Sequence, residues 1–414
     1  MQPIKTIKNE TCRMCDGREF DLVVDLGEHP LVNSLIEKKD LDGTEPTYPL
    51  VVNRCRKCSL VQLTDLVDSE EIYRNVDYLF FSSDMPTLKE YFDEFAAEVK
   101  SRFIQNTEDL VVEIGSNDGV MLQHFNGVCR ILGVDPSANV VLRALKRGIP
   151  TMSEFFSERM GRMIAREWGK AKVVMGSNCI AHLNDLRGLV RGVESLLAED
   201  GVFIVEANYW GGMVKNTNYS LIYHDHYSFF SLKNWQDFAP QFGLHVFDAV
   251  VTPAQGGSLR LFMDRGNRPA TDRLAALQKE EEDTKLNTLE TCKQYEQNVW
   301  SVAKKLRATL EDLKSQGKKL AGYGAAAKGF TILRCSNIGK EFLDFFVDDS
   351  PAKQGWYTPL DHIEIISRAD AAARTPDYFV ILAPNYAKVI VEKEKAFHDA
   401  GGKFVVPIGN IDIL

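Results

Sequence analysis

The densest group of titratable side chains in the sequence is the run Tyr223-His224-Asp225-His226-Tyr227. It combines imidazole, carboxylate and phenol groups, which can move a proton or hold a developing negative charge. A histidine with an ordinary pKa of ~6.5 is a base at neutral pH, and such groups concentrate at functional sites. A metal site on the two histidines and a structural turn are the alternatives, although no third ligand stands nearby. The run therefore favours proton-transfer chemistry.

The spacing of Tyr223 and His226 predicts the local backbone. Side chains three residues apart point to opposite faces of a strand, whereas they converge in a turn or a helix. We predict that the run is turned, with both side chains facing one cleft. His182, in the turn after an earlier strand, is interpreted as structural, because a lone histidine there is more often structural than catalytic. Tyr78 lies in an aromatic-rich segment, where most tyrosines are half-buried packing residues.

Four of the eight cysteines form two C-x2-C pairs, Cys12 with Cys15 and Cys55 with Cys58. Each pair can present two thiolates to one ion, and four thiolates complete the tetrahedral, closed site that suits zinc. Four unrelated thiols are the alternative. A closed site leaves no open position for water, so the predicted role of the zinc is structural. The segment between the pairs is longer than in a small zinc ribbon and must be structured on its own.

A further candidate site begins at a buried strand, residues 110–114. A Gly-rich turn follows at residues 115–119, and the apolar pattern at residues 120–125 predicts a helix. A second apolar strand, residues 130–135, ends on Asp135. An acid at the tip of the second strand of a doubly wound sheet can accept hydrogen bonds from the ribose hydroxyls of an adenosine.

The glycine spacing indicates which adenosine ligand is expected. A dinucleotide site has the pattern G-x-G-x-x-G, whereas this turn has Gly115-x-x-x-Gly119. Two carboxylates, Glu113 and Asp118, would repel a pyrophosphate and suit an ammonium and a sulfonium, so the pattern favours S-adenosylmethionine over NAD. An ordinary turn without ligand is the alternative. The expected donor contacts are Glu113, Gly115, Ser116, Asn117, Asp118, Gly119 and Asp135, with Ser177 and Asn178 at the end of a later strand.

Alternating strands and helices must position these groups. Strands are predicted at 149–152, 172–178, 202–206 and 255–263, and helices at 85–103, 137–147 and 186–197. Together they predict a central, doubly wound Rossmann-like α/β domain whose site lies at the carboxyl ends of its strands. Phe155 and Phe156 follow the third strand and fit either an adenine contact or the core. Residues 274–313 contain no Gly or Pro and predict a long helical connector.

From residue 318 the α/β pattern restarts and predicts a second, smaller Rossmann-like unit. Residues 319–329 read as strand, Gly-rich turn and helix start, and residues 342–347 read as a second strand. Two more strands are predicted at 378–382 and 403–407. Bare backbone amides and Lys328 at the first turn suit a phosphate or a pyrophosphate. A purely structural copy of the fold is the alternative.

Length and composition limit the protein class. The chain has 414 residues, 44% apolar and 26% charged, as expected for a globular protein of two to four domains. A net charge of −9 argues against broad nucleic-acid or anionic-membrane binding. No apolar run approaches the ~20 residues of a membrane span, and the N-terminus lacks an apolar signal core, so a cytoplasmic protein is expected. The oligomeric state is not readable.

Taken together, the motifs resemble the zinc-containing sugar-nucleotide C-methyltransferases, which methylate 4-keto deoxysugars at C3. The resemblance covers nearly the whole chain. It rests on the paired C-x2-C, on the segments 113–119 and 223–227, on Gly322-Tyr-Gly-Ala-Ala-Ala-Lys-Gly329, and on the downstream segments 347–349 and 353–359. It implies a zinc domain (1–75), a domain binding S-adenosylmethionine (76–270), a helical connector (271–315) and a domain that helps hold the nucleotide sugar (316–414).

The resemblance also implies roles for individual residues. His226 is the expected base, with Tyr223, Asp225 and Tyr78 as its companions. The expected acceptor is a nucleotide-linked 4-keto deoxysugar. Its expected contacts are Gly324, Ala325, Lys328, Asp348 and Asn385.

Two departures from the family pattern fall in regions that can contact the acceptor. Asp225 stands where the family usually has Glu, and Pro384-Asn385-Tyr386 stands where a Trp-Asn-Phe-like run is expected. The sugar and its nucleotide base therefore stay open. Methylation of an oxygen or a nitrogen on a nucleotide sugar is the rival enzymatic hypothesis, and a non-catalytic, zinc-anchored binding protein is the other.

Overall fold

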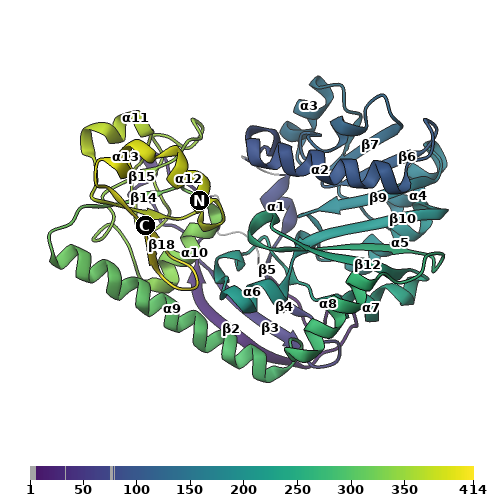
Figure 1. The fold of residues 1–414 in the computed structure, drawn as a ribbon, viewed down its shortest axis with the longest axis horizontal. Coiled ribbons are helices and arrows are strands. Elements are labelled where there is room, and N and C mark those ends of the chain that lie inside the picture. The colour runs from purple at the N-terminus through teal and green to yellow at the C-terminus, as the bar shows by residue number, and fades with distance from the viewer. Residues whose placement is uncertain (1–5, 33, 75–77, 79) are drawn as a thin grey trace.

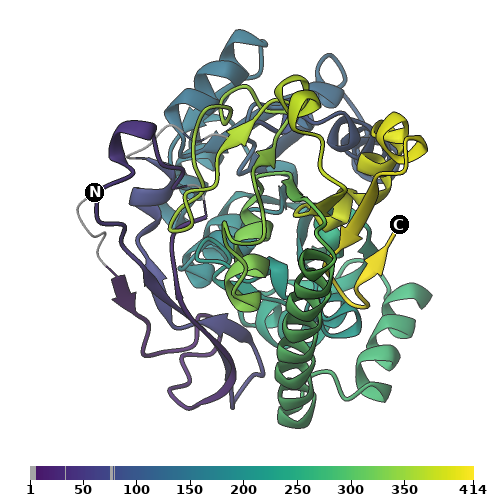
Figure 2. The ribbon, with the colours of Figure 1, turned by 90° about the vertical axis from the view of Figure 1, so that its left-hand side faces the viewer.

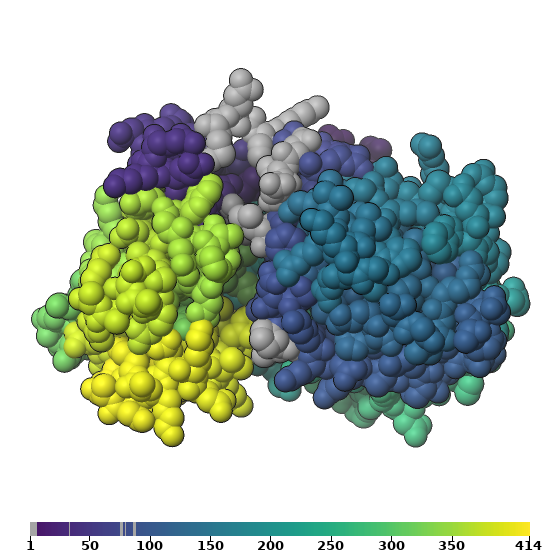
Figure 3. Space-filling view, turned by 90° about the horizontal axis from the view of Figure 1, so that it is seen from above, coloured from purple at the N-terminus to yellow at the C-terminus, as the bar shows by residue number. Residues whose placement is uncertain are grey.

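The computed structural model describes residues 6–32, 34–74, 78 and 80–414. Two α/β units lie side by side, and the long helix α9 (Leu289–Ser315) runs beneath (Figure 1). The N-terminal strands lie on one side of the molecule and the C-terminal strands on the other (Figure 2). Seen from above, the two units meet along a seam (Figure 3).

Seven strands form the central sheet, in the order β12-β13-β10-β9-β6-β7-β8. The bounds are β6 Leu110–Ile114, β7 Arg130–Asp135, β8 Thr151–Ser153, β9 Ala171–Ser177, β10 Leu197–Asn208, β12 His245–Thr252 and β13 Ser258–Asp264. All pairs are parallel except the two that involve β13. The strand order reverses between β6 and β9, so the predicted doubly wound sheet is confirmed and its ligand crevice lies at this point.

Helices cover both faces of the central sheet. They are α2 Pro86–Phe103, α3 Ala138–Lys146, α4 Glu158–Glu167, α5 Leu186–Leu196, α6 Trp210–Asn216 and α7 Leu232–Phe238. Successive side chains of a strand point to opposite faces. Val111 of β6 belongs to the apolar cluster that contains Phe95 of α2, and Val112 belongs to the cluster that contains Val190 of α5. Burial on both faces explains why β6 is a continuous apolar run.

Two predicted elements differ from the structure. The α-helix expected after Gly119 is wrong, because only a 3-10 turn, Leu122–Phe125, forms there. Asn117 and Gly119 both have positive φ, 48° and 75°, which bends the chain away from a helix. The apolar pattern that predicted the helix belongs to loop side chains buried in the core, such as Met121. The strand expected at 342–347 is shorter, β15 Phe346–Val347.

The predicted helical connector consists of two helices, α8 (Asp272–Asp283) and α9. Lys285 has a φ of 52° between them, and the Thr288 side chain caps α9 by accepting a hydrogen bond from the amide of Thr291. Such an N-cap starts a new helix rather than continuing the old one.

An N-terminal sheet has the order β11-β4-β3-β2. Its bounds are β2 Phe20–His29, β3 Tyr48–Cys55, β4 Val61–Leu63 and β11 Ser228–Phe229. A separate pair is formed by β1 (Thr6–Lys8) and β5 (Asp65–Val67), which leads into α1 (Ser69–Tyr73). The second cysteine pair lies between these two strands, because β3 ends at Cys55 and β4 begins after Cys58. The strand β11 comes from far along the chain, directly after the run Tyr223–Tyr227.

The C-terminal sheet has the order β16-β15-β14-β17-β18-β19. Its strands are β14 Leu320–Tyr323, β15, β16 Ile365–Ile366, β17 Tyr378–Ile381, β18 Lys403–Val406 and β19 Asp412–Ile413. Its helices are α10 Ala327–Ser336, α11 Arg368–Ala371, α12 Ala387–Lys393 and α13 Lys395–Asp399. The strands are parallel except for the last pair, so the second Rossmann-like unit is confirmed. Within the described residues, no helix is long and apolar enough to cross a membrane.

Candidate functional site

A cavity of about 140 Å³ lies at the carboxyl ends of β6, β7 and β9, where the strand order reverses. We call it the first cavity. Of the residues that the sequence predicted for a methyl donor, Gly115, Asn117, Asp135, Ser177 and Asn178 line it. Phe155 and Phe156 line it as well, so both rings can meet a ligand. The parallel strands thus bring distant predicted residues to one place.

Asp135 forms part of the wall of this cavity. Its two carboxylate oxygens accept hydrogen bonds from the amides of Asn117 and Ser137, each at 3.0 Å. Burial raises the pKa of Asp135 to about 6, although these two hydrogen bonds act in the opposite direction. The amides hold the carboxylate in place, and each oxygen keeps a further lone pair for a ligand hydroxyl.

Glu113, near the end of β6, shows whether the site is suited to S-adenosylmethionine. The side chain is buried, and its Oε2 has no hydrogen-bond partner among the described residues. Burial, together with the charges of Asp135 and Asp118, raises the pKa of Glu113 well above its ordinary value. A buried acceptor without a partner is unfavourable unless a ligand supplies a donor or a cation. The ammonium and sulfonium of S-adenosylmethionine fit this requirement.

Besides Glu113, three of the predicted donor contacts do not line the first cavity. Asp118 is fully buried and turns the other way, where it accepts a hydrogen bond from Ser83 and lies 3.3 Å from Arg143 and Arg147. The packing of the other two is set by neighbouring strands. Ser116 lies against Gly133 of β7, and Gly119 lies against Ile149. These residues shape the turn rather than the cavity wall.

His226 is buried beside the first cavity, with 6% of its surface exposed. Its Nδ1 lies 2.6 Å from the carbonyl oxygen of Leu221, which can only accept, so Nδ1 carries the hydrogen. Nε2 is then the basic nitrogen, and it lies 2.8 Å from the hydroxyl of Tyr223. Burial lowers the pKa of His226 well below its ordinary value, and His182 and Lys328 add to the effect. The imidazole is therefore neutral at physiological pH.

The backbone of the run Tyr223–Tyr227 is turned, as the spacing predicted. The amide of His226 donates to the carbonyl of Tyr223 at 2.9 Å, and the two rings lie 4.0 Å apart. His224 points elsewhere, towards the N-terminal sheet, where its Nε2 lies 3.3 Å from the carbonyl oxygen of Tyr48. The turn thus separates the two histidines of the run.

Asp225 is buried. Burial raises its pKa to about 7. Burial, followed by the charge of Asp225, raises the pKa of Tyr73, Tyr78 and Tyr223. No hydrogen-bond partner of Asp225 occurs among the described residues, so the carboxylate can receive a donor group from a ligand.

Sequence reasoning missed two residues of this site. His182 lines the first cavity, its Nδ1 is hydrogen-bonded to the hydroxyl of Tyr73, and its ring stands edge-on to that of His226 at 4.9 Å. The sequence predicted only a structural role for His182 and did not predict that it lines the cavity. Its position in the turn after β9, at the carboxyl edge of the sheet, was the signal that could have found it. Nothing in the sequence around Tyr73 marked that residue.

A second cavity, of about 580 Å³, lies between the two α/β units. It is lined by Lys328, Asn385, Asn218, Gly256 and Lys215, among others. Lys328 donates to the carbonyl of Gln255 at 2.7 Å, and Gln255 itself lines the first cavity, so the two cavities adjoin at this residue. Burial lowers the pKa of Lys328 to about 7.

The other predicted acceptor contacts are placed differently. Asn385 keeps a buried Oδ1 without partner among the described residues, as a ligand-binding amide would. Gly324 and Ala325 do not line the cavity. Asp348 accepts a hydrogen bond from the amide of Ala325 at 2.8 Å and so fixes the Gly-rich turn. Of the five predicted residues, the structure brings Lys328 and Asn385 into the cavity wall.

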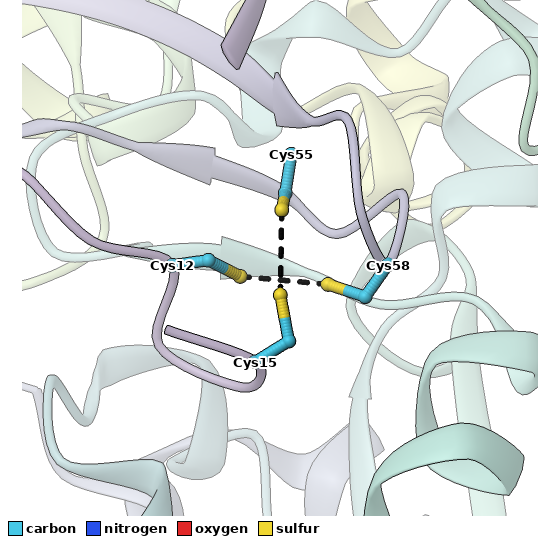
Figure 4. A group of neighbouring side chains, drawn as sticks. All are labelled: Cys12, Cys15, Cys55 and Cys58. Carbon is cyan, nitrogen blue, oxygen red and sulfur yellow. Dashed lines mark hydrogen bonds between the residues drawn. The ribbon is translucent and has the colours of Figure 1, made fainter. Parts of the chain in front are cut away.

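The four predicted cysteines converge, and their sulfur atoms all lie within 4.8 Å of one another (Figure 4). Cys12 and Cys58 are 3.5 Å apart, as are Cys15 and Cys55. Four sulfurs arranged around one point match a closed zinc site. Cys12 also accepts a hydrogen bond from the side-chain amide of Gln62 at 3.2 Å, the kind of outer contact that orients a metal ligand.

Three family models match successive parts of the chain. Residues 12–73 match a zinc binding domain, residues 88–249 a methyltransferase domain, and residues 253–409 a C-methyltransferase C-terminal domain. Over 405 residues the chain is 33% identical to C-methyltransferase NovU of Streptomyces niveus, and the match covers 96% of this chain and 95% of that protein. The chain belongs to the C-methyltransferase family. It is an enzyme, with a zinc-binding region at its N-terminus.

Solved structures resemble this C-methyltransferase more distantly. Magnesium protoporphyrin IX methyltransferase (ChlM) from Synechocystis PCC 6803 is 14% identical, with a TM-score of 0.34, over 48% of this chain and 89% of that chain. An S-adenosylmethionine-dependent methyltransferase from Clostridium acetobutylicum is 12% identical, with a TM-score of 0.35, over 45% of this chain and 94% of that chain. The assignment of the C-methyltransferase family rests on the relative and the family models. It favours methylation of carbon over the two rival hypotheses.

Proposed function

We propose that the enzyme transfers the methyl group of S-adenosylmethionine to a carbon beside the ketone of a nucleotide-linked 4-keto deoxysugar, with C3 as the expected carbon. The observation that carries this proposal is the buried, neutral His226, whose Nε2 faces Tyr223 next to the first cavity. A carbon beside a ketone becomes nucleophilic when it loses a proton, and a positioned neutral imidazole is suited to take that proton.

The hydrogen bonds around His226 support its role as the base. With Nδ1–H held by the Leu221 carbonyl, the lone pair of Nε2 points towards the Tyr223 hydroxyl. When Nε2 takes a proton, the same carbonyl stabilises the positive charge on the ring, since a hydrogen bond to a charged donor is stronger than one to a neutral donor. Leu221 therefore fixes the tautomer and favours the protonated product.

The tyrosines around Asp225 are suited to the enolate. Negative charge develops on the ketone oxygen as the proton leaves, and preorganised hydroxyl donors at that position lower the barrier. Tyr73, Tyr78 and Tyr223 are the candidates, because the first two line the first cavity and the Tyr223 hydroxyl lies 2.8 Å from Nε2 of His226. When bound in the first cavity, S-adenosylmethionine supplies the electrophilic methyl carbon. Asp135 and Glu113 would hold it there.

The second cavity is the proposed site of the nucleotide. Lys328 stands at the start of α10, and its ammonium donates to the carbonyl of Gln255, which lines the first cavity. The next turn of α10 contacts the residue just before the run Tyr223–Tyr227, because Thr331 donates to the carbonyl of Ile222 at 2.8 Å. A phosphate at Lys328 would thus place the attached sugar beside His226.

Hydrogen exchange tests the reaction class. We expect deuterium from D2O to enter the carbon beside the ketone when the enzyme is incubated with 4-keto nucleotide sugars without methyl donor. NMR of the sugar would separate exchange at C3 from exchange at C5, the two carbons beside a C4 ketone. A methylated oxygen or nitrogen with no exchange at carbon would refute the proposal.

Asp135→Ala should weaken the binding of S-adenosylmethionine. Loss of hydrogen bonds between a carboxylate and ribose hydroxyls costs ~1–3 kcal/mol, or roughly 5- to 150-fold in the dissociation constant. Calorimetric titration of the variant with S-adenosylmethionine measures this. Asp135→Asn keeps one acceptor oxygen and should lose less. An unchanged dissociation constant in Asp135→Ala would show that the ribose binds elsewhere.

Lys328→Met should raise KM for the nucleotide sugar and leave donor binding unchanged. The pKa of Lys328, lowered to about 7 by burial, adds a pH dependence. Below this pH the side chain is an ammonium that can pair with a phosphate. Above it the side chain is a neutral amine, which must gain a proton before the ion pair can form. KM of the wild type should therefore rise as the pH increases beyond about 7, whereas KM of Lys328→Met should not.

The matched control is Lys215→Met, since Lys215 lines the same cavity but is exposed. It should change KM less than Lys328→Met does. Equal activity with the free sugar and with the nucleotide sugar would contradict a phosphate site at Lys328.

A further inference from the structure

We propose that Arg13 and Gln62 form a brace between the cysteine cluster and the segments that carry His182 and His226. The brace holds these two histidines in position. The two residues lie outside both cavities and touch no substrate, so they are positioning residues. This inference rests on the proposed role of His226 as the base.

Gln62 is the link between the cysteine cluster and the run Tyr223–Tyr227. It lies on β4, with 1% of its surface exposed, and pairs across the sheet with Ser228 of β11. Its Nε2 donates to the sulfur of Cys12 at 3.2 Å. Its Oε1 accepts from Nη1 of Arg13 at 2.9 Å and from the backbone amide of Arg13 at 3.3 Å. The Gln62 side chain thus binds Cys12 and the residue that follows it, Arg13.

Arg13 connects Gln62 to the two segments that carry the histidines. Its Nε donates to the side-chain oxygen of Asn184, two residues after His182, at 3.0 Å. Its guanidinium lies 5.5 Å from the ring centroid of Tyr227, the residue after His226. A planar guanidinium can donate along its edge and contact a ring with its face, which a lysine cannot do.

The two segments also contact each other at this point. The amide of Tyr227 donates to the carbonyl of Ala181 at 2.8 Å, and the Tyr227 hydroxyl donates to the carbonyl of Val67 at 2.7 Å. The amide of Leu63 on β4 donates to the carbonyl of Tyr227 at 2.9 Å. Tyr227 is therefore fixed on three sides, and Arg13 covers its ring.

The charge of Arg13 explains why the brace needs the metal site. Arg13 is 5% exposed, and no carboxylate forms an ion pair with it among the described residues. A buried cation without a counter-charge is strongly unfavourable. Four thiolates around one Zn²⁺ carry a net charge of −2. Gln62 is hydrogen-bonded to both Cys12 and the Arg13 guanidinium, so the guanidinium lies near this charge. The cysteine cluster thus provides the negative charge that keeps Arg13 buried.

The brace matters because the two histidine rings stand edge-on at 4.9 Å. A shift of ~1 Å in a catalytic geometry can lower the rate by roughly 100-fold. We therefore expect Arg13→Met to lower kcat by ~10- to 100-fold, while zinc content and the dissociation constant for S-adenosylmethionine stay near those of the wild type. Exchange of the sugar hydrogen with D2O should slow by the same factor, because exchange requires the base and not the donor.

Arg56→Met is the matched control, because Arg56 follows Cys55 as Arg13 follows Cys12. Its Nε lies 2.7 Å from Asp21, and its side chain is more than half exposed. It should leave kcat and zinc content unchanged. Asn184→Ala removes one contact of Arg13 at an exposed position and should lower kcat several-fold without loss of stability. It keeps the brace testable if Arg13→Met does not fold.

The outcomes separate the brace from the base. If His226→Ala is inactive while Arg13→Met and Asn184→Ala keep wild-type kcat and exchange rates, the brace is refuted. If His226→Ala keeps its activity, the base assignment fails, whatever the Arg13 variants do. A parallel loss of zinc, donor binding and turnover in Arg13→Met and Asn184→Ala would show that Arg13 serves only the stability of the N-terminal sheet.

Discussion

His226→Ala should lose most of its turnover while it still binds both substrates. A general base contributes ~10²–10⁴-fold to the rate, and a methyl group in place of the imidazole removes it completely. Steady-state kcat, exchange of the sugar hydrogen with D2O, and calorimetric binding of S-adenosylmethionine measure the three expectations separately. Only the first two should fall.

His224→Ala is the matched control for this variant. Both histidines are buried in the same turn, but His224 contacts the carbonyl of Tyr48 in the N-terminal sheet and not the first cavity. It should lose much less turnover. Equal activity of the two variants, or near-normal turnover in His226→Ala, would move the search for the base to Tyr223 and Tyr78.

The pH profile gives an independent check on His226. Only the neutral ring can accept a proton, so kcat/KM should fall when the pH drops through the pKa of His226. Because burial lowers this pKa well below its ordinary value, the acid limb should lie below ~6.5, the pKa of a free histidine. A rate that already falls by half at a higher pH would point to another titrating group.

Removal of the metal should have the second large effect. Cys55→Ser replaces one of the four sulfur ligands with a poor one, and a structural zinc site contributes on the order of 10 kcal/mol to folding. The variant should contain little zinc and should unfold at a lower temperature than the wild type. Metal analysis of the purified protein and thermal unfolding followed by circular dichroism measure both expectations.

Cys129→Ser is the control, because Cys129 is half-buried and lies outside the cluster. It should keep both the metal and the melting temperature. Wild-type protein that contains no zinc when pure, or a Cys55→Ser variant with normal zinc content, would contradict a four-cysteine site.

Local patterns in the sequence predicted the parts of the molecule that depend on local interactions. The buried strands around Glu113 and Asp135 follow from runs of apolar residues, and the paired cysteines follow from their spacing. The turn that contains Tyr223 and His226 also follows from spacing, because two side chains three positions apart can converge only if the backbone is turned or helical. These features require no knowledge of which segments meet in space.

Features that depend on distant segments could not be read in this way. Asp118 was expected at the donor, but its partners are Arg143 of α3 and Arg147 just after it, and nothing in the turn shows which way the Asp118 carboxylate points. His182 and Tyr73 meet only through the fold. The helix expected after Gly119 failed because loop residues buried in a core can match a helical apolar pattern by chance.

The pairing of β11 with β4 has a consequence for how the chain is made. During synthesis, the N-terminal strands leave the ribosome first and can fold around their metal. The edge of β4 that receives Phe229 must wait until roughly 170 further residues have been added, on the order of ten seconds or more at ~5–20 residues per second. Throughout that interval β4 presents an open strand edge, the feature that invites pairing with other chains. Nascent enzyme is therefore most vulnerable to aggregation before its active site exists.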